Sequence, residues 1–154
     1  MPSFSGHLSP YWNPHSSGSI VGLSYNSSPV DIYRACLEGI AFSVQDCVTA
    51  LEKSVKLNTI TADGGVSTAK YCMQFQSDIM NKKIRVSDYP DCTPLGVALG
   101  AAWGAGYFKS IDDLKQFNPS YSEVEPQEDK THLYKKWKLT NENNIRLCEQ
   151  LKQL

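Results

Sequence analysis

The chain has 154 residues, of which 41% are hydrophobic and 20% are charged, and its formal net charge is −1. This length predicts one globular domain that buries roughly 70% of the surface exposed by the unfolded chain. The near-neutral charge, without blocks of like charge, excludes nucleic-acid and acidic-lipid partners that are held by bulk electrostatics.

Cysteine and histidine usage argues against a disulfide framework and against a metal site. The five cysteines are scattered without a C-x-x-C pair, and His7, His15 and His132 lack partners at ligand spacing. We therefore expect a reducing, cytoplasmic location. The start of the chain does not resemble a signal peptide, and the longest apolar stretch, 95–108, is shorter than the about 20 residues of a membrane span.

A strand pattern followed by a capped helix opens the ordered part of the chain. We predict a short strand at 19–23 and then a helix to about Lys53. Ser28 suits the N-cap, Pro29 suits the first helical position, and Asp31 completes a capping box.

The same logic recurs in the next unit. Residues 58–62 form a β-rich run, and a glycine turn at 63–65 follows it. Ser67 or Thr68 is then expected to cap a helix that continues to about Met80.

A third unit combines a strand at 83–86 with a helix from Thr93 to about Gly106. Gly96, Gly100 and Gly104 recur every four residues on this helix and permit close approach of another element. We therefore expect this helix to be clamped between neighbours.

Alternating strands and helices predict α/β layering. The polar segment 118–130 is expected to be a loop or arm, and the apolar pattern from Thr131 onward predicts a final helix or a broken pair. We divide the chain into a domain core at 1–115 and a polar arm with a C-terminal helix at 116–154, which packs on the same domain.

The sharpest local feature is the tripeptide Asp63-Gly64-Gly65 between a predicted strand and a helix start. Adjacent glycines allow a positive φ and leave backbone N–H groups uncovered, so a phosphate or a ribose can approach closely. A plain strand-to-helix turn uses the same residues without any ligand, and the tripeptide alone favours that interpretation.

Four motifs follow one another along residues 4–108. The first is FSGHLSPYWNP at 4–14, and the second is G-x-I-x-G-L followed by D-I-x-x-A-C-L-E, within 18–38. The third is DGG followed by MQFQSDI, within 63–79, and the fourth is T-x-L-G at 93–96. In this order they resemble the glycerol kinases of the FGGY carbohydrate-kinase family. Tyr134 and Trp137 resemble a late Tyr-x-x-Trp of that family more weakly. Departures from the family pattern include Asn13 for aspartate, Ser17 for arginine, and Cys36.

The resemblance implies an actin-like, ribonuclease-H-like ATPase fold, in which two domains enclose ATP and this chain is the C-terminal half. It also implies that the Gly-Gly turn lies against the adenosine and the α-phosphate, so Gly64 and Gly65 are carried over as nucleotide contacts. The family's asparagine four residues after the second glycine falls on Ala69. A methyl group there loses an amide hydrogen bond, typically worth about 0.5–1.5 kcal/mol.

Phosphoryl transfer to an alcohol needs a base, a metal and groups that position both substrates. The resemblance places all of these before the point where this sequence begins, so we assign no catalytic and no metal-binding residue. ATP or ADP with Mg²⁺ is the expected cofactor, with the metal ligands in the N-terminal half. The paired acids are predicted to be structural carboxylates at caps and loops, and they are Asp88, Asp91, Asp112 and Asp113.

Three hypotheses remain open. The chain is part of a glycerol kinase, which as a whole converts ATP and glycerol to ADP and glycerol 3-phosphate, and is inactive alone. Alternatively, it is a non-catalytic domain that associates with or regulates a full-length kinase, which the start at Met1 and Ala69 favour. The third is a related sugar or polyol kinase. Expected partners are nucleotide, glycerol through the missing N-terminal domain, and a second copy or a first kinase domain docked on exposed apolar surface.

Overall fold

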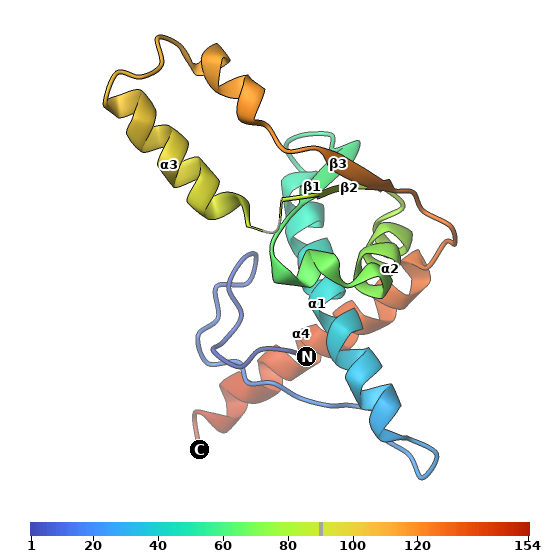
Figure 1. The fold of residues 1–154 in the computed structure, drawn as a ribbon. Coiled ribbons are helices and arrows are strands. Elements are labelled where there is room, and N and C mark those ends of the chain that lie inside the picture. The colour runs from blue at the N-terminus through green and yellow to red at the C-terminus, as the bar shows by residue number, and fades with distance from the viewer. Residues whose placement is uncertain (90) are drawn as a thin grey trace.

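The structure is a computed structural model, and it describes residues 1–89 and 91–154. A small sheet lies against a group of helices, and an arm extends from the sheet (Figure 1). In chain order the elements are α1 (Pro29–Leu51), β1 (Thr59–Ala62), the 3₁₀ helix η1 (Gly65–Thr68), α2 (Lys70–Met80), β2 (Lys83–Ser87), α3 (Cys92–Gly104), the 3₁₀ helix η2 (Ile111–Phe117), β3 (Tyr121–Val124) and α4 (Thr131–Leu151).

Helix α1 begins as its sequence predicts. The backbone N–H of Asp31 donates to the Ser28 hydroxyl at 3.3 Å, and the Asp31 carboxylate accepts from the Ser28 N–H at 2.9 Å. Pro29 occupies the first helical position, where an N–H would have no helical partner. The capping box is therefore confirmed.

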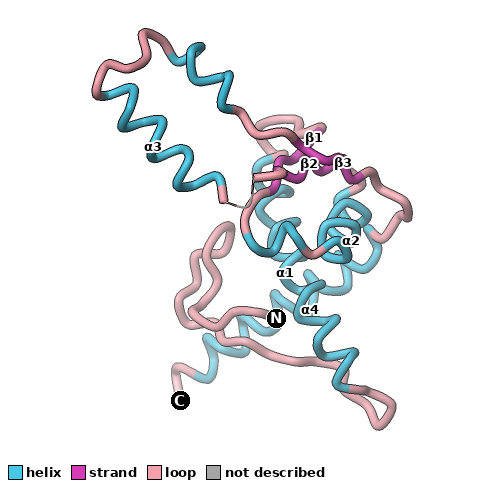
Figure 2. Tube along the Cα trace, viewed as in Figure 1, coloured by secondary structure: helices cyan, strands magenta, loops and turns pink. Residues whose placement is uncertain are grey.

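The sheet has the order β1-β2-β3, with a parallel and an antiparallel pairing (Figure 2). Ile60 lies opposite Ile84 in the parallel pair, and Ile84 lies opposite Val124 in the antiparallel pair. The strand β3 corrects the expectation of an irregular segment at 118–130. The sequence pattern did not indicate this strand because it contains polar residues. Glu123 lies on the outer face of the sheet, where it forms an ion pair with Lys83 at 2.8 Å, and Ser122 lies opposite Val86.

The predicted strand at 19–23 is wrong for this chain. The segment is extended coil, and Ile20, Val21 and Leu23 are 60%, 65% and 59% exposed. Strand structure requires a paired neighbour, and among the described residues only Met1 exchanges backbone hydrogen bonds with this segment, at Ser19.

The core lies on both sides of α2. On one side Phe75 meets Phe42 of α1 edge to face, with 5.4 Å between ring centroids, and Phe42 stacks on Trp137 of α4 at 5.4 Å. On the other side Cys72 and Met73 pack with Ile84 and the inner face of the sheet. Helix α4 is continuous, so the C-terminal pattern forms one helix and not a broken pair.

A carboxylate joins the N-terminal loop to α1 and α4. The hydroxyls of Tyr11 and Tyr134 donate to the two oxygens of Asp46, at 3.0 and 2.5 Å. Burial raises the pKa of Asp46 overall, although both hydroxyls oppose that change. Further along α4, the carboxylate of Glu149 accepts from the amide of Asn13 at 2.6 Å, so α4 holds the loop at a further point.

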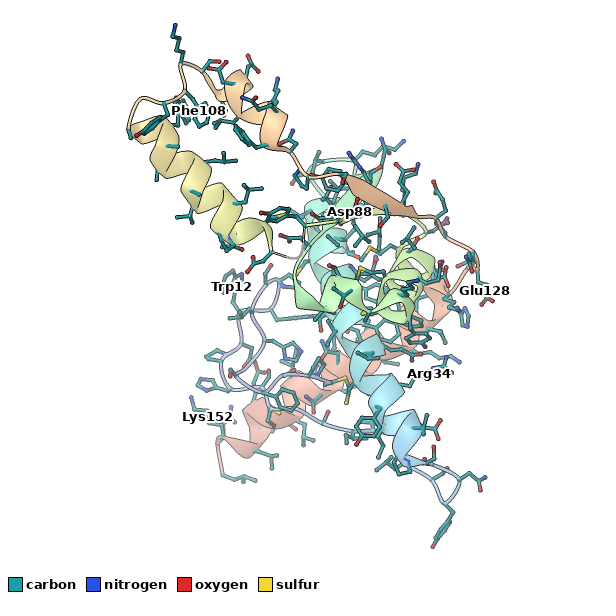
Figure 3. The ribbon with its side chains drawn as sticks, viewed as in Figure 1. Trp12, Arg34, Asp88, Phe108, Glu128 and Lys152 are labelled. Carbon is teal, nitrogen blue, oxygen red and sulfur yellow. The ribbon has the colours of Figure 1, made fainter. Side chains whose placement is uncertain are left out.

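The expectation that α3 is clamped between neighbours is also wrong. None of its residues is buried, and a Cβ on Gly96, Gly100 or Gly104 would meet no atom within 4 Å. With η2 it forms an arm that extends from the sheet, and Phe108 lies at the far end of that arm, 5.6 Å from Phe117 between ring centroids (Figure 3). No described element supplies the second surface that the glycine face was expected to meet.

The buried carboxylate of Asp78 fixes the connection between β3 and α4. It accepts hydrogen bonds from the side chain of Gln74, the backbone N–H of Gln127 and the ammonium of Lys130, each at 2.9 Å. Burial alone would raise the pKa of Asp78, but the hydrogen bonds outweigh it, so this pKa lies below its ordinary value.

Replacing Asp78 with asparagine should destabilise the fold by about 2 kcal/mol, because the groups that donate to this buried carboxylate, including an ammonium, lose their charged acceptor. Since the folded pKa is depressed, the stabilisation from Asp78 is fully present above about pH 4 and disappears as the pH falls through the folded pKa. Urea unfolding at pH 7 and at decreasing pH measures both effects. The control Asp112→Asn, at an exposed i,i+3 pair with Lys115, should change stability by less than about 0.5 kcal/mol. Equal effects of the two substitutions would contradict this role.

Candidate nucleotide-binding site

The turn between β1 and η1 contains a glycine whose backbone conformation other residues adopt only with strain. Gly64 has φ +85° and ψ 176°, in a region that is essentially restricted to glycine. A Cβ on Gly64 or on Gly65 would meet no atom within 4 Å, so the turn is uncovered on that side.

Two hydroxyls hold the carbonyls of the turn. Ser67 Oγ donates to the Gly64 carbonyl and Thr68 Oγ1 donates to the Gly65 carbonyl, both at 2.7 Å. Neither hydroxyl caps the next helix as expected, because η1 intervenes and α2 begins only after Ala69. Ser67 and Thr68 therefore stiffen the turn through hydrogen bonds to its own carbonyls.

The N–H groups of the turn are available to a ligand. Within residues 1–89 and 91–154, no group accepts a hydrogen bond from the backbone N–H of Gly64, Gly65 or Val66. Successive free N–H groups ahead of a helix form a concavity that suits anionic or other oxygen-rich ligands. The turn can thus bind phosphate or ribose oxygens through its backbone.

The neighbouring acids are structural, as predicted for Asp91. The carboxylate of Asp91 accepts from the backbone N–H of Thr93 at 3.0 Å, and that of Asp63 accepts from the N–H of Cys92 at 3.2 Å. Both carboxylates therefore satisfy the first turn of α3. Asp112 pairs with Lys115 and Asp113 forms a capping box with Ser110, so these acids are also structural.

Beside the turn, on the outer face of the sheet, lies a hollow of about 340 Å³. Its walls come from the ends of the strands, the start of α3 and the connection between η2 and β3, and its lining residues are Thr61, Asp63, Ser87, Cys92, Leu95, Gly96, Leu99, Phe117, Asn118, Pro119 and Tyr121. Gly64 and Gly65 do not line the hollow, although they directly follow Asp63, which does. Its size is that of a small-molecule pocket. No local motif could have predicted it, since its walls are far apart in the sequence.

Ala69 lies at the junction of η1 and α2. It is the N-cap residue of α2, with φ −79° and ψ 95°, and its side chain offers no capping hydrogen bond. The methyl group is half-buried and packs against the cluster of Cys72, Met73 and Ile84. Of the three sequence-predicted positions, Gly64 and Gly65 therefore lie at the turn, whereas Ala69 lies after η1 and contributes packing and no side-chain polar atom.

In the part of the chain that the structure describes, no three histidine, cysteine, aspartate or glutamate side chains gather where they could hold a metal ion. Its five cysteines are free thiols. No helix among these residues combines the length and the apolar character needed to cross a membrane.

The family model for the C-terminal domain of the FGGY family of carbohydrate kinases matches residues 1–105. The chain therefore belongs to the FGGY carbohydrate kinases and carries sequence of their C-terminal domain.

Among these kinases, the chain is similar in sequence to glycerol kinases. It is 39% identical over 140 residues to the glycerol kinase of Malacoplasma penetrans and 34% identical over 143 residues to that of Vibrio vulnificus, in each case covering 90% of this chain and 28% of the relative. The chain thus spans less than a third of the length of these relatives.

Solved structures show the same relationship. The crystal structure of Plasmodium falciparum glycerol kinase with ADP superposes with a TM-score of 0.72 at 35% identity, over 94% of this chain and 29% of that one. A ligand-bound xylulose kinase from Lactobacillus acidophilus gives 0.72 at 23% identity, over 99% and 30%, which shows the fold alone. The expected actin-like ATPase fold and the resemblance to glycerol kinases are confirmed.

The two glycines of the turn should respond differently to alanine. Gly64→Ala is expected to destabilise the fold by about 1–3 kcal/mol, purely through backbone strain, because its Cβ would meet no atom. Gly65→Ala serves as the matched control, since Gly65 has no positive φ and equally open space, and it should be close to neutral. Denaturant midpoints of the two variants measure the difference, and equal costs would show that Gly64 is no more restricted to glycine than Gly65.

Proposed function

We propose that this chain is the nucleotide-side part of a glycerol kinase, an ATP-dependent phosphotransferase that as a whole makes ADP and glycerol 3-phosphate. The observation that supports it most directly is the open turn at Gly64 and Gly65 in a chain 34–39% identical to glycerol kinases. A structural neighbour solved with ADP supports nucleotide as the ligand of this fold.

In this proposal the turn binds nucleotide through its backbone. Ribose or phosphate oxygens accept hydrogen bonds from the N–H groups of Gly64, Gly65 and Val66. The hydroxyls of Ser67 and Thr68 donate to the carbonyls of the two glycines and so hold those carbonyls away from the ligand. Glycine at both positions lets the ligand approach without a Cβ in its path. The glycine-only conformation at Gly64 is consistent with a turn shaped for the close approach of a ligand.

The remaining chemistry belongs to polypeptide outside this chain. A general base, Mg²⁺ to neutralise the phosphates and groups that orient glycerol are all required for transfer. Among the described residues, the acids near the turn cap α3, and no three acidic, histidine or cysteine side chains converge as metal ligands. We place the Mg²⁺ ligands, the base and the glycerol contacts in the N-terminal portion of the kinase.

The chain alone should show no glycerol-dependent ADP formation, whereas addition of the N-terminal portion of the Malacoplasma penetrans glycerol kinase should restore it. In that complex, Gly65→Val should raise the KM for ATP at least about tenfold, equivalent to about 1.4 kcal/mol, by filling the open side of the turn. A coupled assay that detects ADP, with and without glycerol, measures the glycerol-dependent activity and the KM for ATP.

Asn58→Val is the control, because this exposed residue precedes β1 and so lies at the end of the strand opposite the turn. Its KM should match that of the unaltered chain. Glycerol-dependent turnover by the 154-residue chain alone, or equal KM values for the two variants, would contradict the proposal.

Ala69 favours a second candidate function, that of a non-catalytic domain which binds to and regulates a full-length kinase. The family's asparagine at this position is replaced by a methyl group that packs into the core. The position can then give no polar contact to nucleotide, which lowers the expected affinity by the value of one hydrogen bond.

Restoring the amide tests whether nucleotide reaches this position. Ala69→Asn should tighten ADP binding about two- to tenfold, since one hydrogen bond is worth about 0.5–1.5 kcal/mol. Ala69→Asp is the matched control, because aspartate caps α2 as well as asparagine does but brings no donor and repels phosphate. Calorimetric titration with ADP reads this out. Unchanged affinity in the asparagine variant would show that nucleotide does not reach Ala69.

The exposed arm is a candidate contact for a partner domain. Helix α3 carries no charged residue, and Val97 and Trp103 are 69% and 43% exposed. We propose that it docks either on a first kinase domain or on a second copy of the chain.

We further propose that the chain divides into a domain core at 1–115 and an arm with a C-terminal helix at 116–154. Helix α4 belongs to the same packed unit as the core, because Trp137 packs into the shared apolar cluster.

A further inference from the structure

A buried polar junction joins the N-terminal loop, residues 1–19, to α1 and α4. The loop lies beside α4 (Figure 1), and its His7 and Tyr11 rings meet edge to face with 5.5 Å between their centroids. Asn141 of α4 is 0% exposed and faces both of these side chains. The Tyr11 hydroxyl in turn donates to Asp46 of α1 at 3.0 Å. Three elements therefore meet at this junction.

Polar atoms at the junction lack partners. The ring atom Nδ1 of His7 and both polar atoms of the Asn141 side chain, Oδ1 and Nδ2, are buried, and within residues 1–89 and 91–154 none of the three forms a hydrogen bond. Native proteins pair nearly all buried polar groups, because an unpaired one is destabilising. Asn141 offers a donor and an acceptor between His7 and Tyr11, so a small rotation of its amide would pair all three atoms.

The carboxylate of Asp46 fixes the direction of these bonds. An ionised carboxylate only accepts, so the Tyr11 hydroxyl uses its proton on Asp46 and can only accept from Asn141 Nδ2. Asn141 Oδ1 then finds a donor only if His7 carries its ring proton on Nδ1. The opposite ring atom, Nε2, can accept from the Ser3 hydroxyl, 2.9 Å away. The complete chain of bonds thus requires a neutral His7 with its proton on Nδ1.

A second proton on His7 disturbs this arrangement. Nε2 would then donate, so the hydroxyl of Ser3, which is 3% exposed, would lose its acceptor. Burial is the largest influence on the ring and lowers the pKa of His7, and the amino group of Met1 acts in the same direction. Asn141 and the charge of Asp46 oppose this change without reversing it. The docked loop therefore favours the neutral ring.

Charged groups of α1 and α4 also act on the junction. On α1, burial raises the pKa of Asp46, so its titration opposes that of His7 as the pH falls. On α4, the charge of Lys138 acts on Asp46 and that of Glu142 acts on Tyr11. A variant that lacks the imidazole but keeps these groups isolates the contribution of His7.

We propose that His7 and Asn141 form the central link of a pH-sensitive latch, which fastens the N-terminal loop to α4 while His7 is neutral and loosens when His7 is protonated. The latch uses no residue of the glycine turn and does not depend on the proposed function. Because the docked ring has the lower pKa, its stabilising contribution is fully present above the ordinary histidine pKa of about 6.5. That contribution declines as the pH falls through the pKa of the docked ring.

Nitrogen NMR of the full chain, labelled with ¹⁵N, tests the direction of the bonds without any variant. At pH 7.5 the ring of His7 should be neutral and carry its proton on Nδ1. A proton on Nε2 alone, or a doubly protonated ring at this pH, would overturn the latch.

A pair of variants tests the link between the loop and α4. The readout is the hydrogen-exchange protection factor of the Asn13 amide, which donates to the His7 carbonyl at 2.8 Å within the loop. His7→Leu and Asn141→Leu should each lower it at least about fivefold, because the remaining partner is left buried and unpaired. The double variant should return to within about twofold of the unaltered chain, since neither partner remains. Asn143→Leu, at an exposed position of α4, is the control and should have no effect.

The response to pH separates a latch from a purely structural contact. Between pH 7.5 and 5.5 the protection factor of Asn13 should fall at least about threefold more in the unaltered chain than in the double variant. The double variant is the appropriate reference, because it keeps Asp46 and also His15, which contacts Lys152. An equal response of the two chains to pH, or additive effects of the two leucine substitutions, would overturn the proposal.

Discussion

The burial of α2 on both sides is the constraint on which the rest of the structure depends. Eight of its eleven residues are buried, with Phe75 and Ile79 in the cluster shared with α1 and α4, and Cys72 and Met73 against the sheet. Because η1 leads directly into α2, a helix fixed in this way also fixes the glycine turn before it. The position of the candidate site is therefore set by apolar packing several residues downstream.

The molecule divides into a packed part and surfaces without partners. Helices α1, α2 and α4 and the inner face of the sheet share apolar contacts, whereas α3 and the segment 19–23 expose apolar side chains. This imbalance agrees with a chain that covers under a third of its glycerol kinase relatives. Exposed apolar surface of this kind is typical of contact sites for other polypeptide.

The candidate site is built from backbone, and this explains what it can and cannot do. N–H groups of a rigid turn can hold oxygen atoms of a ligand, but they supply neither a base nor a metal ligand. The acids nearest to the turn, Asp63 and Asp91, are engaged at the start of α3. In the proposed function this gives a division of labour, in which this chain positions nucleotide and another part of the kinase carries the reaction.

Local chemistry was predictable from the sequence alone, and long-range pairing was not. The capping box at Ser28, the glycine turn at 63–65 and the family motifs depend on neighbouring residues, so the sequence determined them. Only the tertiary structure decided four other features, namely the strand β3, the hollow beside the turn, the hydrogen bond from Ser67 to the Gly64 carbonyl, and the exposure of α3. The physical reason is that strand pairing and burial depend on partners far away in the chain, or outside it, and a local pattern of apolar residues does not identify those partners.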